Sequence, residues 1–248
     1  MANWSDPRPA ATAFQAGRAG VRSEAYDAGL RRYMLSVYNY MASGVLLTGI
    51  VALLFAQSGM AAQVFGQPGI LKYVIIFAPL AFVMVLSFGI NRLSTGSAQA
   101  LFWAFATVMG LSMSTIFIRY TGASIAITFF ATATAFLSLS LYGYTTKRDL
   151  SGFGTFLMMG VIGLIVASIV NIFLQSSAVM FAISAIGVLI FAGLTAYDTQ
   201  NIKATYVAHA AQGDAEWLGK AAIMGALQLY LDFLNMFMML LQLFGNRN

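Results

Sequence analysis

Apolar runs of about twenty residues recur along the chain, separated by short polar segments. A helix of ~20 residues, rising ~1.5 Å per residue, crosses the ~30 Å hydrocarbon core of a bilayer. Barrel strands would be only ~10 residues long and would alternate, whereas these runs are apolar on every side. Because backbone groups inside a bilayer must be paired internally, the runs are predicted to be helices. We predict seven spans: 33–56, 70–90, 100–118, 123–142, 153–174, 179–197 and about 222–244.

The first 32 residues follow a different pattern. They contain two prolines, five arginines and three acids and no long apolar run. We expect residues 1–32 to form a cytoplasmic polar tail that is partly disordered near its start, and residues 33–248 to form a seven-helix transmembrane domain. The first apolar run is too long for a cleavable signal peptide, so it is expected to remain as the first span.

Composition narrows the class of protein. Hydrophobic residues make up 60% of the 248 positions, charged residues only 8%, and cysteine is absent. A soluble domain of this length could not cover its surface with so few charges, and disulfide-rich or disordered classes are excluded as well. The fold class is therefore predicted to be an all-α membrane protein, a bundle of seven transmembrane helices.

The basic residues lie mainly at the ends of the predicted spans. Ten of the thirteen Lys and Arg residues fall on one side of the membrane and three on the other. The positive-inside rule then places the N-terminus in the cytoplasm and, with seven spans, the C-terminus outside. The net charge of +5 is explained by this orientation, and no nucleic-acid partner is expected. The cytoplasmic (inner) membrane is the expected location.

Two acids stand inside the predicted spans, Asp198 at the end of the sixth and Asp232 within the seventh. A carboxylate in the bilayer is costly and normally faces a polar interior. If Lys203 and Gly225 mark the cytoplasmic interface, Asp198 lies ~7 Å and Asp232 ~10 Å inside it, so the carboxyls can meet. If the buried segment starts at Ala221, most of another turn separates them. Two touching carboxyls in a low dielectric are expected to share one proton.

Polar neighbours extend this candidate site. Gln228, Asp232 and Asn235 fall on one side of the seventh span, where Gln228 and Asn235 are candidate pore or latch neighbours. Plain hydrogen bonding between helices is the alternative. Arg92 follows the second span on the cytoplasmic side and is a candidate gating residue that pairs with Asp198 or competes for it; the alternative is a simple anchor at the membrane surface.

The sequence offers no recognisable set of catalytic residues. The single histidine, His209, falls in the predicted cytoplasmic loop 199–221, far from the serines of the spans. One histidine and no cysteine cannot build a zinc site of the usual kind, and no phosphate-binding Walker loop is present. We expect a protein that is not an enzyme and that carries no cofactor.

Two runs of sequence resemble a known family. AYDTQNIK at 196–203 closes the sixth span, and LYLDFLNMF at 229–237 lies within the seventh. Together they look like the paired signatures of the Bax inhibitor-1 (transmembrane Bax inhibitor motif) family, in its bacterial branch. The resemblance covers the chain from about residue 30 to its end.

The resemblance implies a fold and a function. The last helix is expected to lie at the centre of the other six. Members are associated with a pH-sensitive Ca²⁺ leak, and Asp198 and Asp232 match the buried aspartates that act as its proton-sensing latch. Arg92 matches a basic residue that can bridge to the aspartate of the sixth helix. Some relatives carry an acid within the second span; Ala78–Ala81 occupy that place here, without an acid.

These features predict a passive cation leak, with Ca²⁺ as the permeant ion, gated by protons at the aspartates. Asp198 and Asp232 would hold Ca²⁺ only weakly and transiently, as conduction requires. Two alternatives stay open. One is a membrane regulator that binds a partner, such as a membrane-bound protease, without flux of its own; the other is a proton-coupled transporter.

Overall fold

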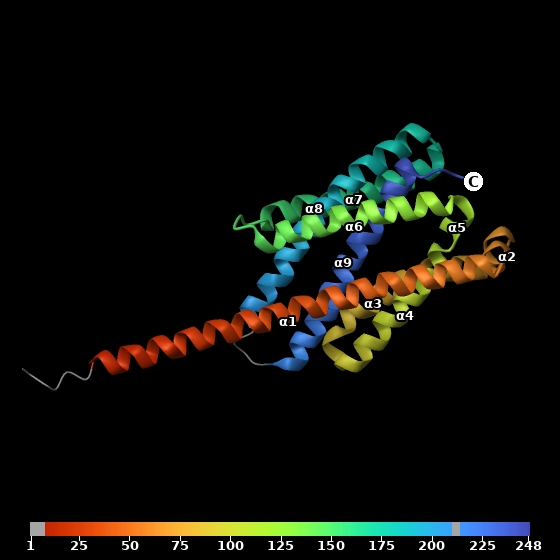
Figure 1. The fold of residues 1–248 in the computed structure, drawn as a ribbon. Coiled ribbons are helices and arrows are strands. Elements are labelled where there is room, and N and C mark those ends of the chain that lie inside the picture. The colour runs from red at the N-terminus through yellow and green to blue at the C-terminus, as the bar shows by residue number, and fades with distance from the viewer. Residues whose placement is uncertain (1–7, 210–213) are drawn as a thin grey trace, which may run out of the picture.

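The computed structural model describes residues 8–209 and 214–248, with side chains from Tyr26 onward. Seven of the helices in these ranges are long and apolar enough to cross a membrane, and they follow the predicted spans in number and order (Figure 1). The helices are α1 (Arg8–Gln57), α2 (Met60–Gly66), α3 (Ile70–Gly89), α4 (Thr95–Met113), α5 (Thr115–Arg119), α6 (Gly122–Thr145), α7 (Ser151–Leu174), α8 (Ser177–His209) and α9 (Ala215–Phe244).

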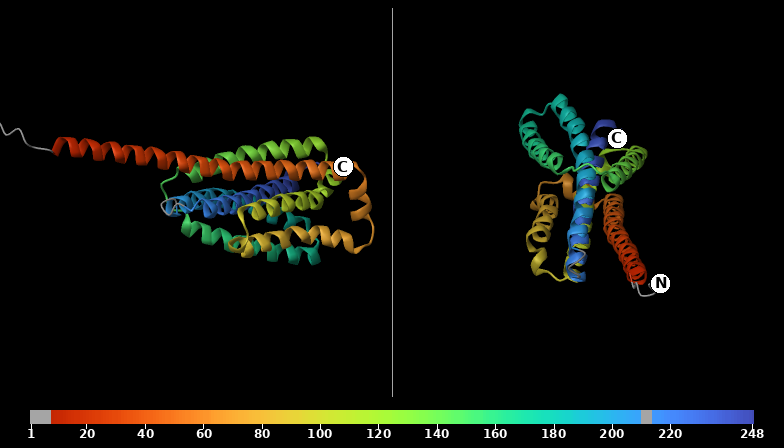
Figure 2. Two further views of the ribbon diagram at one scale, coloured as in Figure 1. Left: turned by 90° about the horizontal axis from the view of Figure 1, so that it is seen from below. Right: turned by 90° about the vertical axis from the view of Figure 1, so that its left-hand side faces the viewer.

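The first helix is longer than the sequence pattern predicts. Helix α1 begins at Arg8 and continues without a break through residue 32, where the polar tail was expected to end. Pro9 lies in its first turn, where proline costs no hydrogen bond, and no proline follows it within the helix. At ~1.5 Å per residue, α1 is ~75 Å long and projects well beyond the bundle (Figure 2). Residues 1–7 lie outside the described residues.

The predicted loop 199–221 is wrong over most of its length. Helix α8 continues to His209, and α9 already begins at Ala215. Residues 199–209 contain neither proline nor glycine, so nothing in them stops the helix. The Asp214 carboxylate caps α9 by accepting a hydrogen bond of 3.0 Å from the Trp217 N–H. Residues 210–213 of the predicted loop lie outside the described residues.

The third predicted span is also divided. Ser114 separates α4 from α5, and its hydroxyl donates to the Leu111 carbonyl at 2.7 Å. The loop between the first two spans contains the short helix α2, which the hydropathy pattern did not predict. Neither change alters the number of crossings.

Helix α9 lies at the centre of the bundle. It packs against α8, α1, α6 and α4, whereas α3 contacts mainly α4, and α7 contacts α8 (Figures 1 and 2). In the most apolar window of each span, 61% of α9 is buried inside the protein, but only 11% of the α3 window and 17% of the α7 window. The remaining helices therefore enclose α9 unequally, with α3 and α7 outermost.

Candidate functional site

The two aspartates predicted to meet do come together, one from α8 and one from α9. The carboxyls of Asp198 and Asp232 lie close enough to share a hydrogen bond. Asp232 is only 4% exposed, and its Oδ2 receives no hydrogen bond from an N–H or hydroxyl group in the described part of the chain. Asp198 is half-buried. Two carboxyls can share a hydrogen bond only when one of them carries a proton, so this aspartate pair (Asp198 and Asp232) is a candidate site for one shared proton.

Two glycines set the position of α8 beside the pair. A Cβ on Gly143 of α6 would overlap the Ala196 carbonyl, and a Cβ on Gly154 of α7 would overlap the Tyr197 ring. Small residues let membrane helices approach closely. Helices α6 and α7 can therefore pack directly against the turn of α8 that ends in Asp198.

The residues after Asp198 connect α8 to its neighbours. The Thr199 and Ser140 hydroxyls lie 2.9 Å apart, and the Tyr38 hydroxyl lies 2.5 Å from that of Ser140, which joins α8, α6 and α1. The Gln200 amide donates to the Arg148 carbonyl at 2.7 Å. The Lys203 ammonium donates to the Tyr144 carbonyl at 2.8 Å, where the last turn of α6 leaves carbonyls unpaired. These contacts fix α8 just beyond the aspartate pair.

Helix α9 is fixed two residues before Asp232. Tyr230 is fully buried, and its hydroxyl lies 2.6 Å from that of Thr48 on α1. Thr48 in turn donates to the Ala106 carbonyl of α4 at 2.9 Å. The Tyr230 ring packs edge-on against Phe105, with ring centroids 5.1 Å apart. The rotation of α9, and with it the direction of Asp232, is thus held from the side opposite α8.

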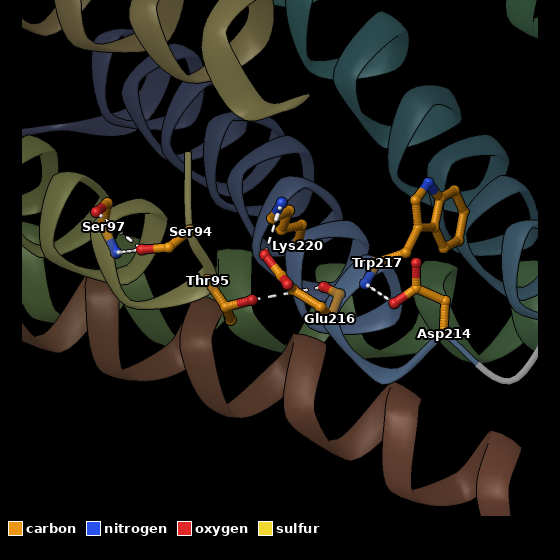
Figure 3. A network of polar contacts seen from close by, with 7 residues as sticks. All are labelled: Ser94, Thr95, Ser97, Asp214, Glu216, Trp217 and Lys220. Atoms are coloured by element: carbon orange, nitrogen blue, oxygen red, sulfur yellow. Dashed lines mark hydrogen bonds and ion pairs between the residues drawn. The ribbon is translucent and has the colours of Figure 1, made fainter. Parts of the chain in front are cut away.

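The first turn of α9 is held as well. The Thr95 hydroxyl, at the start of α4, donates to the Glu216 carbonyl at 3.5 Å, and Glu216 pairs with Lys220 at 2.9 Å (Figure 3). His209 stacks on Trp217 with ring centroids 4.0 Å apart, which joins the end of α8 to the start of α9. The predicted cytoplasmic ends of α8, α9 and α4 therefore meet in one polar cluster.

The other predicted site residues form no hydrogen bond or ion pair with the aspartate pair in the described part of the chain. Gln228 is exposed one turn before Asp232, and the Asn235 amide donates to the Leu231 carbonyl of its own helix at 2.8 Å. Arg92 ends the short 3₁₀ turn after α3, is exposed, and forms no ion pair with an acid in the described residues. Its pairing with Asp198 stays a prediction.

A polar pocket of about 460 Å³ opens at the opposite end of the α8–α9 contact. The Ser184 hydroxyl of α8 donates to the Gln242 amide oxygen of α9 at 2.8 Å within it, and Asn171 and Arg247 line its sides. Sequence reasoning did not predict this pocket, because its walls come from segments far apart in the chain.

No group of three or more His, Cys, Asp or Glu side chains that could hold a metal ion is found in the residues with described side chains. The aspartate pair supplies two carboxyls only. A cation there would have to complete its coordination with water, since Ca²⁺ takes six to eight oxygen ligands. Such a site suits transient occupancy better than tight binding.

The fold and this pair together define the class: a multi-pass helical membrane protein with two carboxyls in contact inside its bundle. The family model described as "Inhibitor of apoptosis-promoting Bax1" matches residues 30–248. The chain therefore belongs to the Bax inhibitor-1 family, as the two aspartate runs indicated.

Full-length relatives agree with this assignment. An uncharacterized protein of Caulobacter vibrioides is 50% identical over 231 residues, covering 88% of this chain and 90% of that protein. The inner membrane protein YbhL of Escherichia coli is 50% identical over 220 residues, covering 89% and 94%. An uncharacterized protein of Rickettsia prowazekii is 46% identical over 226 residues, covering 91% and 94%. Likeness to YbhL and the seven apolar helices together support a multi-pass protein of the inner membrane.

Proposed function

We propose that this protein is a passive cation leak channel, with Ca²⁺ as the permeant ion, and that proton binding at the aspartate pair gates it. The observation that carries the proposal is the close approach of the Asp198 carboxyl of α8 and the buried Asp232 carboxyl of α9 inside the bundle. Carboxylate oxygens suit a hard divalent cation. The proposal involves no catalytic step and no bound cofactor.

The charge on the pair determines whether α8 and α9 stay together. With one proton, the two carboxyls are joined by a hydrogen bond, and the helices are held closed. Without it, two negative charges repel each other in surroundings of low dielectric, where Coulomb forces are strong. The deprotonated pair would part and also attract a cation. Cation flux is therefore expected to rise from acid to neutral pH.

Access to the pair differs on its two sides. Toward the predicted cytoplasmic face, the exposed Gln228 lies one turn, or ~6 Å, from Asp232. Toward the outside, the polar pocket at Gln242 lies ten residues further along α9, or ~15 Å. Met239 lies within this interval and packs against Gly187 of α8, where a Cβ would lie 3.0 Å from its Cγ. We infer that Met239 is the barrier between the pair and the outer pocket.

Flux measured with purified protein tests the proposal. Liposomes that contain the protein and a Ca²⁺ indicator are expected to take up Ca²⁺ slowly at acid pH and about tenfold faster at neutral pH. A repulsion of ~1.4 kcal/mol between the two carboxylates would shift the balance toward the open state by this factor of ten. Asp198→Asn and Asp232→Asn remove the second charge, so both variants should leak slowly at either pH.

Asp149→Asn is the matched control. Asp149 is an exposed acid between α6 and α7, and the N–H and hydroxyl of Ser151 donate to it, which lowers its pKa below the usual range. It stays ionised throughout the tested window, so its amide variant should keep the native pH profile. If both pair variants keep that profile too, the pair is not the gate. If native protein in liposomes shows no flux at any pH, a regulator that acts through a partner, such as a membrane protease, is the better description.

A further inference from the structure

A second candidate site lies along α1, away from the aspartate pair. A groove of about 600 Å³ runs between α1 and α4 from the predicted cytoplasmic end of the bundle. Two arginines stand at its mouth, polar side chains continue inward, and an indole forms the α4 wall. We call it the α1–α4 groove; its lining residues are Ala28, Arg31, Arg32, Leu35, Ser36, Asn39, Tyr40, Ser43 and Trp103.

The mouth of the groove is strongly positive. Arg31 and Arg32 are both exposed, and neither forms an ion pair with an acid in the described part of the chain. Among the residues with described side chains, no acid lines the groove, and Asp27, one turn before Arg31, does not contribute to its wall. Two adjacent guanidinium groups that form no ion pair within the described residues are suited to a phosphate, which arginine can bind through two hydrogen bonds at once.

Polar groups continue from the mouth toward the membrane interior. Arg32, Ser36, Asn39 and Ser43 fall at i, i+4, i+7 and i+11, so they share one face of α1. Asn39 is exposed ~10 Å along the helix from Arg32. An amide that faces hydrocarbon at this depth is costly unless it finds a hydrogen-bond partner, and the residues with described side chains leave Asn39 exposed. The arrangement calls for an occupant with polar groups below its charge.

The α4 side of the groove is apolar and fixed. Trp103 lies 6.2 Å from Tyr40 between ring centroids, and 5.5 Å from the buried Phe102. The Gln99 amide donates to the Tyr40 hydroxyl, which holds that ring against α4. Tryptophan and tyrosine are typical of the boundary between headgroups and acyl chains.

We propose that the α1–α4 groove binds one anionic phospholipid. Its phosphate lies between Arg31 and Arg32, its glycerol ester oxygens accept hydrogen bonds at Ser36 and Asn39, and an acyl chain runs along Trp103. The order of groups along α1, cationic and then polar beside an apolar wall, follows the order of groups along a phospholipid. A second copy of the chain would bring four arginines together, and a free phosphate would leave the inner polar and apolar walls uncovered.

Fluorescence of Trp103 provides the test. Trp4→Phe and Trp217→Phe leave Trp103 as the single indole of the chain. This protein is placed in phosphatidylcholine vesicles that contain a small fraction of either phosphatidylglycerol or phosphatidylcholine with brominated acyl chains, which quench a nearby indole. Brominated phosphatidylglycerol is expected to quench Trp103 more strongly at the same fraction. Arg31→Gln with Arg32→Gln should lower this preference roughly thirtyfold, since each basic residue near an anionic lipid contributes ~1 kcal/mol.

Lys147→Gln with Arg148→Gln is the matched control. It removes two exposed cations next to Gln200 of α8, outside the groove, and should leave the preference in place. Equal quenching by the two brominated lipids, or an equal loss in both double variants, would overturn the proposal. Weak quenching by either lipid would show that a second copy of the chain covers the face, and loss of quenching on adding soluble glycerol phosphate would show a site for free anions; both results contradict it.

Discussion

Helices α9 and α3 both cross the membrane, yet they follow opposite rules. Helix α3 is the more apolar of the two and the less buried. Only 11% of its most apolar stretch is buried inside the protein, against 61% for α9. Helix α9 carries Asp232 and Asn235, and it lies at the centre. In lipid, an apolar helix gains little by leaving the surface, whereas a polar side chain gains a partner only inside. The polar residues of a span, rather than its apolar ones, therefore indicate which helix is central.

The largest loss of stability should come from forcing helices α6 and α8 apart. Gly143→Leu places a side chain against the Ala196 backbone, where α6 meets α8, and should destabilise the protein by about 3 kcal/mol, the upper range for overpacking. Gly163→Leu on the outer helix α7 is the control, since a Cβ there meets nothing within 4 Å. Thermal unfolding in mild detergent measures both. Equal losses of stability would mean that α7 is packed as tightly as the centre.

Opening the inferred barrier at Met239 is expected to raise the rate of Ca²⁺ leak severalfold. Met239→Ala removes the side chain that covers Gly187 and should raise Ca²⁺ leak at neutral pH, because a narrow apolar constriction blocks a hydrated ion. Met84→Ala on α3 is its counterpart, with a side chain that is exposed toward lipid. Flux in liposomes compares the two. An unchanged rate in Met239→Ala would place the barrier elsewhere.

The smallest effect concerns one hydrogen bond. Tyr230→Phe removes the hydroxyl that lies 2.6 Å from Thr48 and should cost about 1 kcal/mol, the usual range for such a bond between membrane helices. Tyr73→Phe on α3 alters a side chain that is 54% exposed and should cost almost nothing. Denaturant unfolding resolves a difference of this size. If both variants unfold like the native protein, Tyr230 does not hold α9 in place.

The same contrast explains what could be predicted from the sequence. The seven spans, the family and the contact between Asp198 and Asp232 follow from local hydropathy, helical spacing and two short runs of residues. Gly143 and Gly163 are both glycines within apolar helices, and nothing in the sequence distinguishes them, because only the first meets another backbone. The Tyr230–Thr48 contact spans 182 positions, so local periodicity does not indicate it.

The ends of the helices were harder to predict for a related reason. Hydropathy marks where a helix leaves the hydrocarbon, but not where the helix itself ends. Residues 199–209 become polar and yet stay helical, because Thr199, Gln200 and Lys203 find partners on α6 and in the loop that follows it. Helix α1 likewise passes unbroken through residue 32, just before the apolar run of the first span begins.

Infrared difference spectroscopy of the protein in lipid tests most directly whether the aspartate pair holds a proton. A protonated carboxyl has a carbonyl band distinct from the bands of a carboxylate. We expect the native protein to show this band at acid pH and to lose it in the pH range where Ca²⁺ flux rises. The Asp232→Asn variant should lack the band at every pH, whereas the Asp149→Asn variant should keep it. A band that persists in Asp232→Asn, or native protein without such a band while its flux still depends on pH, would contradict the account.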